Sequence, residues 1–462
     1  PESRRPIAML RRITFGLLLG SVLLGGCDDL TVPDYNNPSI EDLQTNPTRT
    51  GVLTAATGLL VGARLNIADP NAYISLLGIL GRESYNFDTA EPRFITELLS
   101  GQLTPGGAFG GNLWALRYRN IRNANIVLNA LDQVPGLTEQ EKSAIRGFAK
   151  TIKALDYLLI INTRDVQGAV IDVDRPVGDL NDNPPPIATR EQVFQHIVML
   201  LNEAQAHLQA AGGSFPFPLT SGFSNFNTPS SFLRFNRALK ARVDVYMRNY
   251  PEALQSLQAS FLDTSRPLDY GAYYNFGAGS GETQNNLSSA TIRAHPSVVA
   301  NAQRQPSGEL DRRVQQKVQQ ITPRSQLGLS SDLGFTIYPD PDSRVPIITN
   351  EELILLRSEA RWFTGDRTGA TADLNLIRQQ AGGLAPIGVP ASDDAYVTAL
   401  LRERAYSLLF EGHRWIDVRR FNRLDLLPLD RPEFIRQSAF PIPEAECLAR
   451  GILEGECSAT NQ

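Results

Sequence analysis

The sequence predicts a mainly α-helical protein, a scaffold of tetratricopeptide-like helical hairpins that carries long loop insertions. Three observations support this fold class: recognisable helix starts, apolar residues at helical spacing, and helices that pair across short turns. Each helix start places a threonine three residues before a glutamate or glutamine, which satisfies free backbone N–H groups of the first turn. The three pairs are Thr138 and Glu141, Thr189 and Gln192, and Thr349 and Glu352.

Helical hairpins are indicated where one apolar pattern stops at a short turn and another begins. Residues 235–246 form such a pattern, and a second helix resumes over residues 252–257. Residues 354–363 turn at Thr-Gly-Asp and resume over residues 370–377. A further pair is expected within residues 118–158. Small residues at the helix crossings let paired helices approach closely, but the spacing is irregular, so we interpret these as degenerate repeats.

Long segments rich in Gly, Pro, Asn, Ser and aromatic residues separate the hairpins. Loops of this length in a compact domain are usually either functional or disordered. The segments are residues 101–111, 172–187, 212–231, 269–286 and 323–346.

The most informative stretch lies near the C-terminus. It reads Arg-Glu-Arg at 402–404, Phe-Glu-Gly-His-Arg-Trp-Ile-Asp-Val-Arg-Arg at 410–420, and Phe-Pro-Ile-Pro at 440–443. If residues 411–420 are helical, four charges of alternating sign fall at successive i,i+3 steps along one face and brace the fold. These are Glu411, Arg414, Asp417 and Arg420. The apolar residues on either side of Gly412 predict two packed helices.

This block, in this order, resembles the C-terminal block of the SusD/RagB family of outer-membrane nutrient-binding lipoproteins. The resemblance implies a SusD-like fold and a cell-surface protein that captures oligomeric nutrients, chiefly glycans, without cofactor. It also implies delivery to a SusC-like TonB-dependent β-barrel transporter in the outer membrane. Trp114, Trp362 and Trp415 match scaffold positions of the family and are expected in the core.

The N-terminal residues predict export and lipid anchoring. Two arginines precede a short apolar run, which suits a signal peptide over residues 1–26. The order Leu-Gly-Gly-Cys at 24–27 looks like a lipobox, so Cys27 is expected to carry acyl chains. Residues 27–40 then form a tether, and residues 41–462 a single SusD-like domain with its family block at about 350–445. A chance cysteine after an ordinary signal peptide is the alternative.

Two further cysteines lie close together near the C-terminus, Cys447 and Cys457. In an oxidising compartment a disulfide between them is expected, contributing about 2–3 kcal/mol to stability. Two free thiols are the alternative.

Charge and motif content argue against nucleic-acid binding and catalysis. With 44 basic and 49 acidic residues, no basic surface is indicated. The 4 histidines have no metal-ligand or nucleophile spacing, so we expect neither a catalytic residue nor a metal centre. An acidic stretch over residues 172–183 raises calcium as a possible ligand, but Pro184 stands where an EF-hand needs glycine and Arg190 where it needs glutamate.

Aromatic residues in the insertions are the remaining candidates for chemistry. An exposed aromatic ring beside amide and charged donors can hold the apolar face of a sugar. The ligand-binding candidates are Arg82, Tyr85, Asn86, Phe87, Tyr273, Tyr274 and Asn275. The alternative for each aromatic is that it pins its own loop onto the helices.

Three other functions stay open. A flatter groove with fewer aromatics would favour peptide cargo. Tightly packed insertions poor in aromatics would favour a helical-repeat envelope scaffold without small ligand. A lipid-anchored hydrolase would need an assembled nucleophile, acid pair or metal set.

Overall fold

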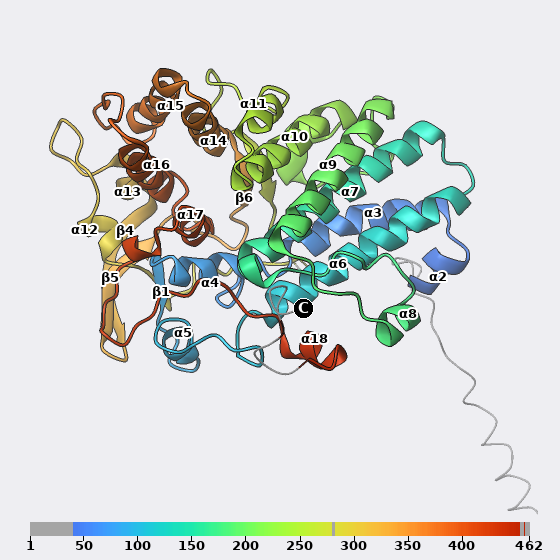
Figure 1. Ribbon diagram of the computed structural model, residues 1–462, viewed down its shortest axis with the longest axis horizontal. Coiled ribbons are helices and arrows are strands. Elements are labelled where there is room, and N and C mark those ends of the chain that lie inside the picture. The colour runs from blue at the N-terminus through green and yellow to red at the C-terminus, as the bar shows by residue number, and fades with distance from the viewer. Residues whose placement is uncertain (1–39, 280–281, 453–456, 458–462) are drawn as a thin grey trace, which may run out of the picture.

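Helices dominate the structure, a computed structural model that describes residues 40–279, 282–452 and 457. Antiparallel helix pairs follow one another across the molecule, and the two strands within residues 318–335 lie at the opposite end from helices α3, α6, α7 and α9 (Figure 1). The predicted mainly α, tetratricopeptide-like class is confirmed. Division into signal peptide, tether and one domain stays a prediction, because residues 1–39 lie outside the described part.

The long helices carry the scaffold. They are α3 (Arg49–Arg64), α6 (Gly111–Ala130), α7 (Glu139–Arg164), α9 (Arg190–Ala210), α10 (Pro229–Tyr246), α11 (Tyr250–Gln258), α14 (Asn350–Phe363), α15 (Arg367–Gln380), α16 (Asp393–Ser407) and α17 (Arg414–Arg420). Shorter helices fill the connections: α2 (Ile40–Thr45), α4 (Tyr73–Leu80), α5 (Arg93–Thr96), α8 (Val177–Asp182), α12 (Ser297–Ala300), α13 (Arg312–Lys317) and α18 (Glu444–Ala449). The 3₁₀ turns in the described part of the chain are η1 (Leu131–Gln133), η2 (Asp165–Gln167), η3 (Ser221–Phe226) and η4 (Leu424–Leu426).

All three hairpins expected from the sequence are present. Helix α6 packs on α7, α10 on α11, and α14 on α15. The last of these turns at Gly365, whose φ of 98° lies in the region that favours glycine. Helix α15 is followed by Gly383, with φ 67°, so the glycines end the helix as predicted.

Two of the three predicted capping boxes form. Thr138 and Thr189 each accept the N–H of the residue three positions on, and Glu141 and Gln192 bond back to the threonine N–H groups. At the third start, Thr349 makes no side-chain cap. Its intended partner Glu352 faces Arg242 of helix α10 instead, with oxygen–nitrogen distances of 2.7 and 2.6 Å. A buried charge on a neighbouring helix therefore outcompetes the local backbone.

Within residues 40–279, 282–452 and 457, three two-stranded antiparallel sheets connect the insertions, and no pattern in the sequence predicted them. Strands β1 (Ser84–Asn86) and β3 (Ile292–Ala294) pair, as do β2 (Gly271–Tyr274) and β6 (Val345–Thr349). Strands β4 (Val318–Gln326) and β5 (Leu329–Phe335) form a hairpin. Most side chains of β4 are polar and exposed, so its sequence lacks the alternation of apolar and polar residues that indicates a strand.

The core is continuous over most of the helices, with a second cluster between α14, α15 and α16. In the second cluster, the rings of Trp362 and Tyr396 stack with centroids 4.1 Å apart. Trp114, Trp362 and Trp415 are all at most 2% exposed, which confirms their predicted place in the core.

Buried ion pairs join the last helices to the scaffold. Asp417 on α17 accepts from Arg404 Nε at 2.7 Å and from Arg420 Nε at 3.0 Å. Arg420 also donates both terminal nitrogens to Glu359 on α14, at 2.5 and 2.6 Å. Burial opposes ionisation of Asp417, but the two arginines outweigh it and hold its pKa at about 2. This cluster, which we call the C-terminal ion-pair cluster, links α14, α16 and α17.

The predicted continuous row of charges is wrong in part. Residues 408–413 form a turn rather than a helix, with Phe410 and Gly412 at φ 57° and 82°. Glu411 therefore leaves the row and lies 3.5 Å from Lys317. His413 lies at the start of α17, where burial lowers its pKa to about 4, so it is neutral at physiological pH.

The described residues include the predicted disulfide but not the predicted lipid anchor. The structure joins Cys447 and Cys457 by a disulfide, as expected for an oxidising compartment. Cys27 and the signal peptide lie outside the described residues. Within the described part, no helix combines the length and apolar character needed to cross a bilayer.

Removing one partner of the buried Glu352 and Arg242 pair should strongly destabilise the protein. We expect Glu352→Gln to lower the free energy of unfolding by about 3–5 kcal/mol, because the arginine charge would remain buried without its counter-ion. Glu91→Gln, at the exposed pair with Arg93, is the control and should change it by less than about 1 kcal/mol. Urea denaturation measures both. Equal effects of the two substitutions would contradict this assignment.

Candidate functional site

The first group of predicted ligand residues is buried around strand β1. Arg82, Tyr85, Asn86 and Phe87 are each at most 3% exposed. Tyr85 pairs with Arg293 of β3 in the register of the small sheet, and its ring stacks on Phe87 with centroids 5.1 Å apart. These side chains therefore pack inside the molecule and present no aromatic surface to a ligand.

Arg82 binds the protein's own backbone. Its guanidinium donates to the carbonyl of Ile79 at 3.1 Å, of Pro428 at 3.3 Å and of Ile435 at 2.7 Å. It thus fastens the end of helix α4 to the C-terminal segment. Desolvation by burial lowers its pKa to about 10, so it still carries its charge. Its backbone has φ 54°, an uncommon conformation for a residue other than glycine.

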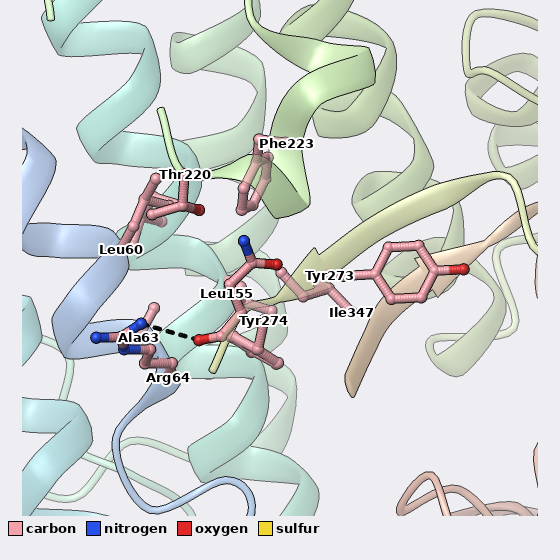
Figure 2. Close-up of a pocket in the computed structure, with 11 residues that line it drawn as sticks. Leu60, Ala63, Arg64, Leu155, Thr220, Phe223, Tyr273, Tyr274 and Ile347 are labelled. Atoms are coloured by element: carbon pink, nitrogen blue, oxygen red, sulfur yellow. Dashed lines mark hydrogen bonds between the residues drawn. The ribbon is translucent and has the colours of Figure 1, made fainter. Parts of the chain in front are cut away.

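The second predicted group surrounds a hollow beside strand β2 (Figure 2). The hollow measures only about 10 Å³, room for no more than a single water molecule. Arg64 closes one side by donating to the Asn275 carbonyl at 2.9 Å. The Tyr273 ring points away from the hollow in Figure 2 and is covered by the Arg344 guanidinium, 3.9 Å from its centroid. Tyr273, Tyr274 and Asn275 therefore do not line a space that fits a sugar.

The insertion aromatics pin their loops to the helices, which was the alternative interpretation. Phe223 and Phe226 on η3 each pack against Phe235 of α10, with centroids 5.2 and 6.0 Å apart. Among the described residues, none of the aromatic side chains is exposed. The expected aromatic plate on the surface is thus wrong for this part of the chain, because the rings serve as core.

The structure contains a cleft large enough for a ligand beside helix α16, which we call the α16 cleft. Its volume is about 360 Å³, within the range typical of small-molecule sites. The walls come from the turn after α4, from α12, α16, the start of α17 and η4. Its lining residues are Gly81, Arg82, Glu83, Ser297, Val298, Asn301, Thr398, Leu401, Arg402, Ala405, Tyr406, Leu409, Arg414, Leu426, Leu427 and Pro428.

The α16 cleft combines aliphatic walls with hydrogen-bonding groups. Leu401, Leu409 and Leu427 provide apolar surface, and Leu426 at its edge is 40% exposed. Arg402 is exposed and has no hydrogen bond or ion pair to any other residue that the structure describes. Its five donors are therefore available to a ligand.

Two other clefts of comparable size contain several charged groups that are already paired, although Arg248 in one and Arg122 in the other have no carboxylate partner among the described residues. A cleft of about 370 Å³ between α9 and α17 contains Arg190 and Arg420, which pair with Asp165 and Glu359. A cleft of about 280 Å³ between α2 and α6 contains Arg175.

Arg175 also bears on the calcium hypothesis. It lies 3.3 Å from Asp172 and 2.6 Å from Asp179, so a cation of the protein occupies part of the acidic stretch. No group of three or more His, Cys, Asp or Glu side chains within residues 40–279, 282–452 and 457 is arranged to hold a metal ion.

Glu83 forms part of the floor of the α16 cleft and holds the turn between α16 and α17. It is 3% exposed, and its Oε1 accepts the Phe410 N–H at 3.2 Å. Its Oε2 has no hydrogen-bond partner in the described part of the protein. Burial raises the pKa of Glu83 to about 8, and the nearby Arg414 charge only partly offsets this effect.

A serine, a histidine and an aspartate meet at the edge of the cleft, which the sequence analysis did not anticipate. His295 Nδ1 lies 2.7 Å from Ser297 Oγ, and its Nε2 lies 3.1 Å from Asp430. Only the histidine and serine are neighbours in sequence, so no spacing rule could have joined Asp430 to them.

The two backbone amides nearest Ser297, which could have served as oxyanion donors in acyl transfer, are bonded within this array. The Ser297 N–H donates to His295 Nδ1 at 3.1 Å, and the Val298 N–H donates to the His295 carbonyl at 3.0 Å. Both amides nearest the serine are therefore already used. We interpret the array as a structural link between α12 and residue 430.

The sequence can be compared with models of known protein families. Residues 349–447 match the model of the SusD family. This part of the chain is SusD-like. This confirms the predicted resemblance, and the matched residues agree closely with the family block expected at about 350–445.

The SusD-like chain also matches solved structures over most of its length. A SusD superfamily protein from Bacteroides vulgatus ATCC 8482 superposes with a TM-score of 0.67 at 16% identity, covering 88% of this chain and 98% of that one. A laminarin-binding SusD-like protein gives 0.65 at 17% identity, covering 88% and 99%. A SusD-like carbohydrate-binding protein from Bacteroides fragilis NCTC 9343 gives 0.67 at 13% identity, covering 87% and 98%. No curated protein matches the sequence.

Glu83 should make the stability of this SusD-like protein depend on pH. Its folded pKa of about 8 lies above its ordinary value of 4.5, so its contribution is fully present below pH 4.5 and is lost as pH rises to 8. We expect the free energy of unfolding to fall between pH 5 and pH 8, and Glu83→Gln to reduce that fall by a few kcal/mol. Urea denaturation at several pH values measures the slope. A slope unchanged in Glu83→Gln would contradict the assignment.

Proposed function

We propose that this SusD-like chain is a nutrient-binding protein that takes oligosaccharides in the α16 cleft and delivers them to a SusC-like TonB-dependent outer-membrane transporter. The observation that carries the proposal is the combination of the SusD family block with an open cleft whose lining suits carbohydrate. Sugars present both C–H faces and hydroxyl groups, and the cleft offers leucines beside Arg402, Ser297, Asn301 and Thr398.

The comparisons support a carbohydrate ligand at the level of the fold. Two of the matched structures are described as a laminarin-binding and a carbohydrate-binding SusD-like protein. At identities of 13–17% their ligands cannot be assigned residue by residue. Without exposed aromatic rings among the described residues, the proposed recognition relies on polar contacts and aliphatic packing rather than stacking.

Cell-surface placement belongs to the same proposal. The lipobox at residues 24–27 would attach the protein to the outer membrane through Cys27, and a large interface with the transporter would follow. Recovery of a TonB-dependent barrel with the full-length protein from native membranes, and acylation of Cys27 by mass spectrometry, test these two parts.

Peptide cargo is the second candidate function. It is favoured by one observation, the lack of exposed aromatic rings in the described part of the chain. The same observation is compatible with a scaffold that binds no small ligand. Titration of residues 28–462 against panels of polysaccharides and peptides separates the three: saturable binding of a glycan supports the proposal, of a peptide the second candidate, and of neither the scaffold.

A bulky side chain in the α16 cleft should weaken binding of the glycan or peptide that the panels identify. Ala405 lies in the lining, so Ala405→Trp places an indole within the cleft, and we expect the affinity to fall at least tenfold. Ala372→Trp, at an exposed position of α15, is the matched control and should bind as the parent protein does. Isothermal titration calorimetry measures both. Equal binding by the two variants would place the ligand elsewhere.

The Ser297 array permits a direct test of the enzymatic alternative. Because the two backbone amides nearest Ser297 are already bonded to His295, we expect the protein to hydrolyse p-nitrophenyl acetate no faster than a Ser297→Ala variant does. A rate that depends on Ser297 and is saturable in the ester would show an esterase and overturn the binding-only proposal.

A further inference from the structure

The α16 cleft has an excess of positive charge that the proposed function does not explain. Its lining holds three arginines, Arg82, Arg402 and Arg414, against a single glutamate, Glu83. The whole chain has a formal net charge of −5, so this excess is local.

None of the three arginines has a carboxylate as a hydrogen-bond partner within the described residues. Arg82 donates to main-chain carbonyls, at 2.7 Å for Ile435, and Arg414 donates to the Leu401 carbonyl at 3.2 Å. Arg402, on the exposed side of α16, has no such partner in the described part of the chain. Carbonyl groups satisfy donors but do not cancel charge.

The carboxylates next to the cleft are already paired with other cations or bonded elsewhere. Asp430 bonds to His295 at 3.1 Å. Glu411 lies 3.5 Å from Lys317, and Asp417 belongs to the C-terminal ion-pair cluster. Glu83 itself is buried, and its raised pKa of about 8 leaves it mainly uncharged at neutral pH. Asp430 still attracts the Arg82 charge and Asp417 the Arg414 charge, so the Arg402 charge is the one that acts most fully on whatever enters the cleft.

We propose that the α16 cleft selects oligosaccharides that carry carboxylate or sulfate groups over neutral ones. This inference rests on the proposed function and narrows its ligand class. Arg402 and Arg414 would contact the anionic groups, because they line the cleft from α16 and from the start of α17. Arg82, whose donors are used, contributes its charge at a distance. Arginine is well suited to this role because its planar fork binds carboxylate and sulfate oxygens in pairs.

Matched pairs of polysaccharides test the inference with the folded protein, residues 28–462. The probes are polygalacturonate with its neutral methyl ester, and laminarin sulfate with neutral laminarin, which also separate carboxylate from sulfate. We expect the anionic member of at least one pair to bind about tenfold or more tightly in 50 mM salt. The difference should shrink in 500 mM salt, because the ions screen the arginine charges.

Two arginine variants test whether the preference for anionic glycans comes from the α16 cleft. Arg402→Gln keeps a helix-forming side chain at an exposed position, so folding should be unaffected, and we expect it to lower the preference for the anionic member by about fivefold to tenfold. Arg234→Gln, at an exposed position on α10 away from the cleft, is the control and should leave the preference unchanged. Circular dichroism should be used to check that both variants are folded.

The outcomes separate this inference from the proposed function. Equal affinity for the neutral and anionic members overturns the charge preference and leaves carbohydrate binding intact. A preference that both arginine variants lower equally shows non-specific attraction and also overturns it. Failure of every glycan to bind, with or without peptide binding, removes the proposed function and this inference together.

Discussion

The fold around the candidate site depends on buried ion pairs between helices. Arg420 joins Glu359 of α14 to Asp417 of α17, and Arg404 of α16 completes the cluster. Burying charges is costly, and the attraction repays that cost only when the geometry is good and the remaining donors and acceptors are bonded. Such a cluster fixes the relative positions of three helices more narrowly than apolar packing does. Two of those helices, α16 and α17, line the cleft, so the cluster also fixes the cleft's shape.

Glu83 connects this C-terminal unit to the N-terminal half of the chain. Its carboxyl group bonds to the turn after α16, while Arg82 beside it bonds to carbonyls near residues 428 and 435. Segments more than 300 residues apart in sequence therefore meet at the cleft. Residues in left-handed conformations on both sides of this junction, Arg82 and Phe410, are held there by these bonds. Such strain is commonly found where a fold forms a functional site.

The helical scaffold could be predicted from the sequence, but the candidate site could not. Local signals are strong for helices, so the threonine caps at 138 and 189 and the hairpin turn at Gly365 were predictable. The cap at Thr349 failed because its glutamate has a better partner on another helix, which no local rule reveals. Strands β1, β2, β3 and β6 were missed because they have only three to five residues, and the longer β4 because it is mostly polar. The expected exposure of the aromatic candidates was wrong because an aromatic residue in a loop gives the same pattern whether its ring faces solvent or the core.

We propose that the α16 cleft is a passive, charge-selective binding site for an imported oligosaccharide. A crystal structure of the protein soaked with the tightest-binding glycan is the decisive experiment. We expect an intact oligosaccharide in the cleft, with an anionic group against Arg402 and an apolar sugar face against Leu426. Density for the glycan at another surface with the cleft unoccupied, or density for a cleaved product beside Ser297, would contradict it.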